Sequence, residues 1–317
     1  MADRIAEVER LRGLWSEAIA ASPQTVFQDF DWNLLALQTF TDEPPCFIAA
    51  ETVSSIAILP IVKRNYSLAL AGGPMFDYRD AIRAGDDSAF MAALEQAAGL
   101  NLPLITNGIR GEAAARRWAK VAPQAWTGAP FVSAAEMPAE AFARNHARGR
   151  RALHRLNELG AMVNREQGTP QIIDKLYRAK AKEQSSWGEN VFRDERCIEF
   201  MGKLVVLPQT RCEIFLLAVT EEPIAALVTF IDGSTRRFYT VWMDPAWARH
   251  SPGVALLFEA TRQTLQEGLD CDYMTGEHPY KLRFSTGSQP LYKLEATVEQ
   301  LSAIRPQAAE REELKAA

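Results

Sequence analysis

The amino-acid sequence predicts an α/β (α+β) protein made of two tandem domains with the same order of elements. Three observations support this prediction. The chain has 317 residues, about twice the roughly 150 of a typical domain. Short apolar runs of strand type alternate with segments whose apolar residues recur at helical spacing. A hairpin pattern at residues 47–59 also returns at residues 215–227.

Each copy of this repeated pattern is typical of a β-hairpin. Phe47 and Ile56 begin apolar runs with a polar turn between them, and Phe215 and Ile224 do the same in the second copy. Both offsets are 168 residues (215 − 47 and 224 − 56). A third apolar run follows each hairpin, SLALAGG in the first copy and RFYTVWM after an Asp-Gly turn in the second. The shared spacing favours an internal duplication, although short apolar hairpins also recur by chance.

The second copy continues into a helix with an unusual start. Apolar residues at helical spacing predict this helix over residues 254–265, and Gly268 suits a left-handed C-terminal cap. Ser251 is a favourable N-cap, and Pro252 suits the first helical position. Because the first N–H groups of a helix lack intrahelical partners, the start is either an anion site or a plain cap.

The first copy differs at the corresponding place, because its helix follows Asp86 and Asp87. Carboxylates at a helix N-terminus satisfy the dipole and repel phosphate. The sequence therefore predicts an N-terminal domain at 1–138 without a cofactor site and a C-terminal domain at 139–306. A charged, alanine-rich tail at 307–317 completes the chain.

An arginine-rich segment joins the two copies. Arg144, Arg148, Arg151 and Arg155 have the spacing that places four side chains on one helix face. Two interpretations stay open for this face. It is either a solvated helix paired with acidic neighbours or a surface that contacts phosphate.

Composition limits the function classes. The net charge of −5 provides no general attraction to nucleic acid or anionic membrane. No apolar run approaches the roughly 20 residues of a membrane span, and the N-terminus has the apolar stripe of a surface helix rather than a signal peptide. The four cysteines and four histidines lack metal-ligand spacing. The sequence therefore predicts a cytoplasmic protein without a metal.

Three motifs resemble a known family. They are MDPAWARHSPGVALL, DCDYMTGEHPYKLRF and an upstream set formed by Trp187, Phe192, Asp194 and Phe200. Over about residues 140–296 the chain resembles the acetyltransferase domain of CelD-like proteins, within the GNAT superfamily. The tandem layout is similar to that of Fem-type aminoacyltransferases. The resemblance implies two GNAT-like domains, each a twisted, mixed, mostly antiparallel sheet flanked by helices.

The resemblance also implies acetyl-CoA or another acyl-CoA as cosubstrate. In GNAT enzymes the pyrophosphate lies against backbone N–H groups where the fourth strand gives way to the next helix. The matching candidates are Arg249, His250, Ser251, Gly253, Val254 and Ala255. They depart from the usual Arg/Gln-x-x-Gly-x-Gly/Ala signature, because Pro252 removes one N–H and the glycine is displaced by one position.

Acyl transfer needs a base, polarisation of the thioester carbonyl and an acid for the leaving thiolate. The segment LDCDYMTGEHPYKLRF is predicted to be a strand, a short loop and a helix that begins near Pro279. Tyr280 is the candidate acid, Lys281 the candidate stabiliser of negative charge, and Glu277 or Asp272 the candidate base. Structural alternatives are a packed aromatic for Tyr280, a helix cap for Glu277 and a surface lysine paired with Glu277 for Lys281.

Trp187, Trp242 and Asp244 are candidates for an acceptor pocket, and Arg148 for contact with a phosphate. Core packing accounts equally well for the tryptophans. The leading hypothesis is direct acyl transfer to an amine or hydroxyl of a small molecule, sugar or envelope-polysaccharide precursor. Aminoacyl transfer from charged tRNA is a second hypothesis, against which the net charge counts. The third is a non-catalytic subunit of a polysaccharide-assembly complex, and no oligomeric state is indicated.

Overall fold

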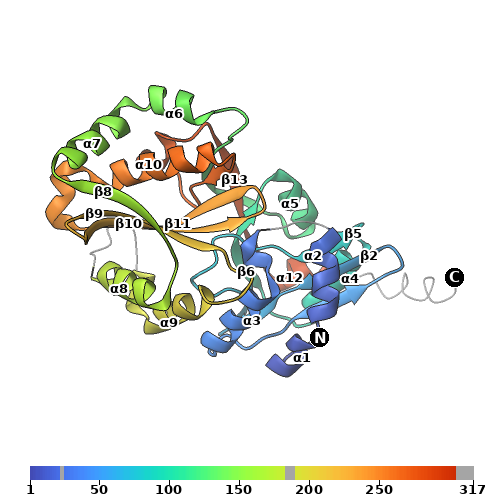
Figure 1. Cartoon of the computed structure of the whole chain (residues 1–317). Helices are drawn as coiled ribbons and strands as arrows, with labels where there is room; N and C mark the ends of the chain where they lie inside the picture. The colour runs from blue at the N-terminus through green and yellow to red at the C-terminus, as the bar shows by residue number, and fades with distance from the viewer. Residues whose placement is uncertain (22–24, 183–189, 305–317) are drawn as a thin grey trace, which may run out of the picture. The chain divides into compact units, whose positions relative to one another are not determined.

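The chain forms two compact units in the computed structural model, which describes residues 1–21, 25–182 and 190–304. Unit 1 contains Met1–Trp126 and the residues from Pro290 onward, and unit 2 contains Thr127–Gln289. Strand β7 (Gln124–Val132) carries the chain into unit 2, and β13 (Gly287–Ala296) carries it back. The observed division therefore differs from the predicted boundary at 138/139, because the last strand returns to unit 1 (Figure 1).

Unit 2 is a twisted sheet covered by helices on both faces. Its strand order is β7-β12-β11-β10-β9-β8, and all neighbours are antiparallel except β11 and β12, which are parallel. Helices α7 and α10 lie on one face, and α8 and α9 lie on the other (Figure 1). The strands are β8 (Ala161–Gln167), β9 (Cys212–Val219), β10 (Glu222–Asp232), β11 (Thr235–Met243) and β12 (Asp270–Asp272). The helices are α6 (Ala139–Asn145), α7 (Ala147–Glu158), α8 (Pro170–Ala181), α9 (Glu195–Leu204), α10 (Pro252–Gln266) and α11 (Pro279–Leu282), with short 3-10 turns η3 (Val191–Arg193) and η4 (Pro245–His250).

Helix α7 packs closely against α10 at a glycine. A Cβ atom on Gly149 would lie 2.7 Å from the Cβ of Phe258, which is closer than side chains approach. The prediction of a single helix through all four arginines is wrong. The backbone leaves the helical region at His146, with φ −106° and ψ 56°, so that Arg144 lies in the last turn of α6 and the other three arginines lie on α7.

Unit 1 contains two sheets. One has the order β3-β4-β6-β13, and the other has the order β1-β2-β5. Their strands are β1 (Ile48–Glu51), β2 (Ser55–Leu59), β3 (Ile61–Arg64), β4 (Ser67–Leu70), β5 (Ile82–Gly85) and β6 (Leu104–Arg110). The helices are α1 (Ile5–Glu9), α2 (Arg12–Ala21), α3 (Phe30–Thr39), α4 (Ser88–Ala98), α5 (Glu112–Arg117) and α12 (Val298–Ser302), with 3-10 turns η1 (Val26–Gln28) and η2 (Trp118–Val121). One apolar core includes residues of α4, β6 and β13, and the other includes residues of α1 to α3.

Both repeated segments form antiparallel hairpins, as predicted: β1 with β2, and β9 with β10. The correspondence continues beyond them. Residues 55–64 form β2 and β3, and the residues 168 positions later (55 + 168 = 223, 64 + 168 = 232) lie in β10. The following turns place Asn65 and Gly233 in the left-handed region, with φ 47° and 51°. Pro60, which has no N–H, separates β2 from β3 where unit 2 has one strand. These matches support an internal duplication.

Candidate active site

Strands β11 and β12 of unit 2 run side by side and then separate. Their parallel pairing covers Thr235–Arg237 of β11 and ends at Asp272 of β12. β11 nevertheless continues to Met243, paired with β10 on its other side. Within the described part of the chain, the second half of β11 thus has backbone N–H and C=O groups along one edge without a neighbouring strand. Such groups are strong hydrogen-bonding partners for a ligand.

A buried ion pair joins the two strands at the point where they separate. Arg237 donates from Nη1 to Oδ2 of Asp272 at 2.6 Å, and from Nε and Nη2 to Asp232 at 2.5 and 2.9 Å. The side chains of Arg237 and Asp272 are 6% and 2% exposed. Oδ1 of Asp272 also accepts the N–H of Met274 at 2.8 Å. Both oxygens of this candidate base are therefore engaged in structural contacts. The sequence analysis did not identify Arg237 as a residue of the site. The adjacent Arg236 and Arg237 at the start of an apolar strand were a signal that could have indicated it.

Helix α10 begins at Pro252, as predicted, but its cap differs from the prediction. Ser251 has a left-handed backbone with φ 55°, and its side chain makes no capping bond. Its carbonyl instead accepts the N–H groups of Val254 and Ala255 at 3.1 and 3.2 Å. Because proline has no N–H, Gly253 provides the first N–H of the helix. A Cβ on Gly253 would have Met243 Sδ as its nearest neighbour at 3.6 Å, so the start of α10 lies beside the end of β11.

The turn η4 connects β11 to α10 and carries the candidate cations. Nε of the exposed Arg249 donates to Nε2 of His250 at 2.9 Å, so the two residues form one polar corner. Asp244 is the N-cap of η4, and its carboxylate accepts the N–H of Ala246 at 2.9 Å. Trp242 and Met243 point to opposite faces of the sheet by strand alternation. Of these two side chains, only that of Met243 therefore lies on the face of the sheet beside Gly253.

Helix α11 follows β12 and carries Lys281, whose side chain is buried. Lys281 is 9% exposed, and Nζ donates to the carbonyl oxygens of Thr275 at 2.6 Å and Met274 at 3.4 Å. The alternative of a surface lysine is therefore wrong. Glu277 is exposed, and one of its carboxylate oxygens accepts from Ser288 Oγ at 2.7 Å. The ammonium group holds the loop between β12 and α11, and Glu277 stays a candidate base.

Tyr280 stacks on His278 at the start of α11. The ring centroids are 5.8 Å apart and the planes differ by 7°. Tyr280 is 38% exposed, and its hydroxyl has no hydrogen-bond partner among the described residues. Partial burial raises the pKa of Tyr280 to about 12, which keeps the phenol protonated at neutral pH. Burial and, to a smaller degree, the charge of Lys281 lower the pKa of His278. The Tyr280 hydroxyl therefore carries a proton that it does not donate to any other described group.

The segment that contains this site matches a known protein family. Residues 142–282 match the family model of the acetyltransferase (GNAT) domain. The matched residues all lie within unit 2. Among solved structures, L-PGS from Bacillus licheniformis has a TM-score of 0.60 at 11% identity, over 92% of this chain and 95% of that chain. Curated protein sequences give no match.

Two further structures resemble the chain over most of its length. The C-terminal domain of a protein described as a lysylphosphatidylglycerol synthetase from Agrobacterium fabrum has a TM-score of 0.57 at 12% identity, covering 92% of this chain and 95% of that chain. FemX has a TM-score of 0.56 at 9% identity, covering 96% of this chain and 99% of that chain. At these identities the likeness shows the fold alone. The CelD-like resemblance stays a prediction.

The fold of unit 2 brings some of the predicted residues together and leaves others apart. Gly253 lies beside the end of β11, which carries Trp242 and leads into Asp244. Arg148 is exposed on α7, and Trp187 lies outside the described residues. Among the residues that the structure describes, no group of three or more His, Cys, Asp or Glu side chains could hold a metal ion. No described helix is both long enough and apolar enough to cross a bilayer.

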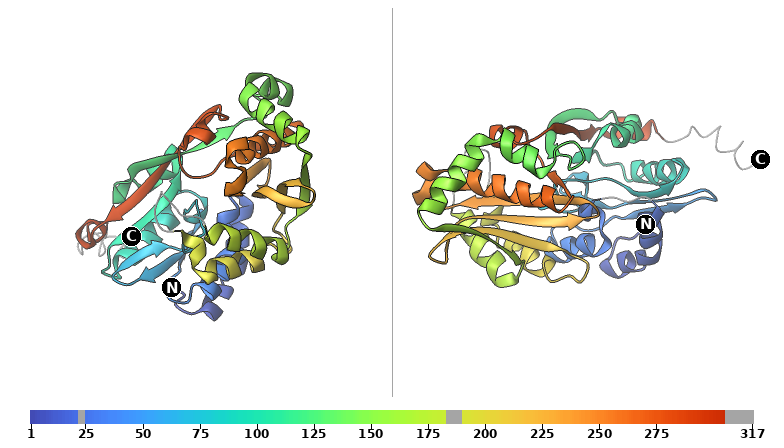
Figure 2. Two further views of the ribbon diagram at one scale, coloured as in Figure 1. Left: turned by 90° about the vertical axis from the view of Figure 1, so that its left-hand side faces the viewer. Right: turned by 45° about the horizontal axis from the view of Figure 1, so that its top comes forward.

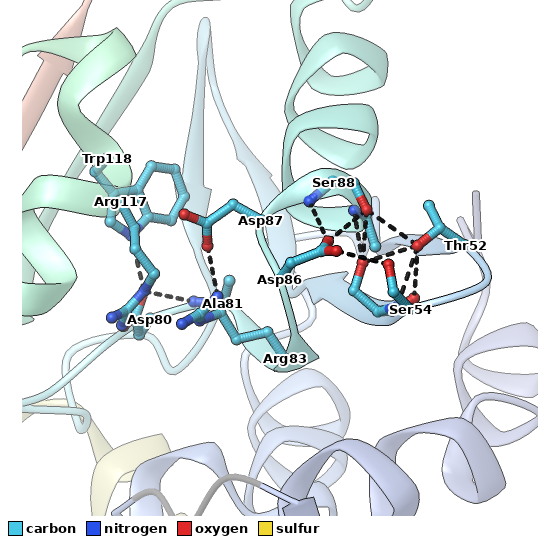
Figure 3. A network of polar contacts seen from close by, with 12 residues as sticks. Thr52, Ser54, Asp80, Ala81, Arg83, Asp86, Asp87, Ser88, Arg117 and Trp118 are labelled. Atoms are coloured by element: carbon cyan, nitrogen blue, oxygen red, sulfur yellow. Dashed lines mark hydrogen bonds and ion pairs between the residues drawn. The ribbon is translucent and has the colours of Figure 1, made fainter.

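In unit 1, side chains of the chain itself fill the N-terminus of helix α4, which follows β5 (Figure 3). Oδ1 of Asp86 accepts the N–H and the hydroxyl of Ser88 at 2.9 and 2.6 Å, and Oδ2 accepts from Ser54 at 2.6 Å. The next N–H, of Ala89, donates to Ser55 Oγ at 3.0 Å. Hydrogen bonds, first from Ser54 and then from Ser88, hold the pKa of Asp86 well below its usual range. A carboxylate of the chain itself thus lies at the N-terminus of α4, where it accepts the N–H of Ser88.

Proposed function

We propose that the chain is an acyl-CoA-dependent acyltransferase and that unit 2 performs the reaction. The separation of β11 and β12 beside the start of α10 carries this proposal. The open edge of β11 suits the amide groups of a pantetheine arm, which pair with backbone as another strand would. Gly253 N–H and the Arg249 guanidinium would hold phosphate at the positive end of α10.

The proposed chemistry is direct transfer in a ternary complex. An amine or hydroxyl of the acceptor attacks the thioester carbonyl, and Glu277 accepts the proton of the nucleophile. The C–S bond then breaks, and Tyr280 gives its proton to the departing thiolate. Lys281 positions Tyr280 by fixing the carbonyl groups of the preceding loop. The acceptor class, a small molecule, sugar or envelope-polysaccharide precursor, rests on the CelD-like resemblance.

One observation favours a second candidate function. The exposed arginines of α7 suit RNA phosphates, and the FemX likeness shows that this fold occurs in that protein. Fem-like aminoacyl transfer from charged tRNA would use this surface. A thermal-shift titration with acetyl-CoA, CoA and tRNA distinguishes the candidates, because a ligand at 100 times its Kd stabilises by about 2.7 kcal/mol. Stabilisation by none of them would favour the non-catalytic subunit.

Replacing Arg249 with alanine should weaken CoA binding by about 1.5–3 kcal/mol, because it removes a charged hydrogen bond to phosphate. Calorimetry with CoA measures the change. Arg178→Ala is the matched control, since Arg178 is an exposed arginine that pairs with Asp174 and Glu195 on the helices of the other face. Equal affinities for the two variants would remove Arg249 from the site.

Lys281→Met should lower turnover by roughly 10²-fold, because Tyr280 loses the anchored loop that aims its hydroxyl. The CoA affinity should change little, since neither Met274 nor Thr275 is a proposed CoA contact. Steady-state kinetics and calorimetry on the folded variant separate these quantities. Lys281→Arg should recover part of the turnover if anchoring of the carbonyls is the role. A parallel loss of turnover and affinity would contradict a positioning role.

A further inference from the structure

Helix α7 presents a row of arginines without acidic partners. Arg148, Arg151 and Arg155 are exposed, and none forms an ion pair or side-chain hydrogen bond with any residue in the described ranges. Many other arginines of the chain are paired, including the buried Arg236 and Arg237. The interpretation of α7 as a helix neutralised by acidic neighbours therefore does not hold. The row is a charged surface available to a partner.

This surface borders the proposed site of unit 2. The turn η4, which ends in Arg249 and His250, packs against α7, and α7 lies along α10 (Figure 2). Leu153 and Asn157 line a depression of about 510 Å³ together with the start of β8. Helical spacing puts Arg148 and Arg155 on the opposite side of α7 from these two residues. The arginines thus face away from the edge of the sheet.

The start of α10 offers few donors to a phosphate. Pro252 has no N–H, and the N–H groups of Val254 and Ala255 are directed at the Ser251 carbonyl. Gly253 N–H and the Arg249 guanidinium are left, and Arg249 also bonds to His250. This set matches one phosphate group better than the pyrophosphate of CoA. A 4′-phosphopantetheine group attached to a protein contains a single phosphodiester.

We propose that unit 2 also takes its acyl group from an acidic acyl carrier protein, which docks on the arginine row of α7. The inference rests on the proposed acyl transfer. The carrier's phosphopantetheine thioester would enter at the start of α10, and its acyl group would pass to the acceptor while the carrier thiol takes the proton from Tyr280. Arg148 and Arg155 are seven residues apart, or roughly 10 Å along the helix axis. Carboxylates at i, i+3 and i+7 on a carrier helix have the same spacing, which gives charge complementarity across the contact.

The test compares how two triple variants bind the two acyl donors, the holo-acyl carrier protein and CoA. Arg148→Gln, Arg151→Gln and Arg155→Gln together remove the row, and Arg10→Gln, Arg116→Gln and Arg211→Gln remove the same charge from exposed positions elsewhere. Calorimetry measures binding of a bacterial holo-acyl carrier protein, of CoA and of a tRNA. The row variant should lose at least about 10-fold in carrier affinity and keep its CoA affinity, whereas the control variant keeps both. Carrier binding should also weaken as salt is raised, because contacts between exposed charges are screened.

Several results would overturn the proposal. Equal carrier affinity in the two triple variants would show that the row is not the docking surface. A loss confined to tRNA binding would assign the row to RNA. If wild-type protein binds CoA but no holo-carrier, this inference fails and the proposed function stands. If it binds neither donor, both fail.

Discussion

Tyr280→Phe should lower turnover by roughly 10²- to 10⁴-fold, the range that general acid catalysis contributes. Phenylalanine keeps the ring that stacks on His278 and removes only the hydroxyl. Binding of CoA should stay within about twofold, because the hydroxyl acts on the leaving thiolate and contributes little to the ground state. The measurements are steady-state kinetics with an identified acceptor and calorimetry with CoA.

The pH profile and the leaving group test the same assignment. The pKa of Tyr280 is raised to about 12, so the phenol keeps its proton and wild-type turnover should have no alkaline limb from this group below about pH 10. A thioester whose thiol is more acidic needs less help from a proton donor when the thiolate leaves. Such a substrate should therefore reduce the difference in turnover between the wild type and Tyr280→Phe. Tyr66→Phe, at an 88% exposed tyrosine of unit 1, should leave turnover unchanged. A Tyr280→Phe enzyme with normal turnover would eliminate the proposed acid.

Arg237→Met should lower the free energy of unfolding of unit 2 by about 3–5 kcal/mol, because it removes one partner of a buried ion pair with Asp272. Chemical denaturation measures this change in the unfolding free energy. The comparison requires that the dependence of that free energy on denaturant concentration has the same slope in the variant and the wild type. Arg178→Met is the control. Its exposed pair with Asp174, at 2.8 Å, should contribute no more than about 1 kcal/mol.

A double-mutant cycle separates the pair from the rest of the fold. Asp272→Asn and Arg237→Met together should destabilise less than the sum of the two single variants, since each removes the other's partner. Strictly additive effects would mean that the two side chains do not stabilise each other. A cost below about 1 kcal/mol for Arg237→Met would show that the junction of β11 and β12 does not depend on this ion pair.

The sequence predicted local elements of the fold well and their partners less well. The hairpins at 47–59 and 215–227 were recognisable because alternation and turn residues are local signals. The division into units was not, since apolar strands do not encode which strand they join. β13 follows the acyltransferase motifs directly, yet its partner β6 belongs to the first half of the chain. The pairing of β13 with β6 therefore sets the boundary between the two units.

The candidate site shows the same limit at single residues. The Ser-Pro-Gly and Tyr-Lys motifs identified the start of α10 and helix α11, which the structure contains. The burial of Lys281 and the ion pair of Asp272 depend on groups brought near by folding, so spacing alone could not predict them. The left-handed Ser251 was also missed, because serine at an N-cap usually has an extended backbone.

The return of the chain through β13 has a consequence for synthesis. Leu104 of β6 pairs with Ala296 of β13, so this sheet of unit 1 is complete only after unit 2 has been synthesised. Unit 2 obtains strands β8 to β12 from one continuous stretch and can assemble earlier. Until β13 arrives, β6 presents an unprotected edge, and such edges pair with other chains. Strand β13 therefore protects this edge of unit 1 from aggregation once unit 2 has been synthesised.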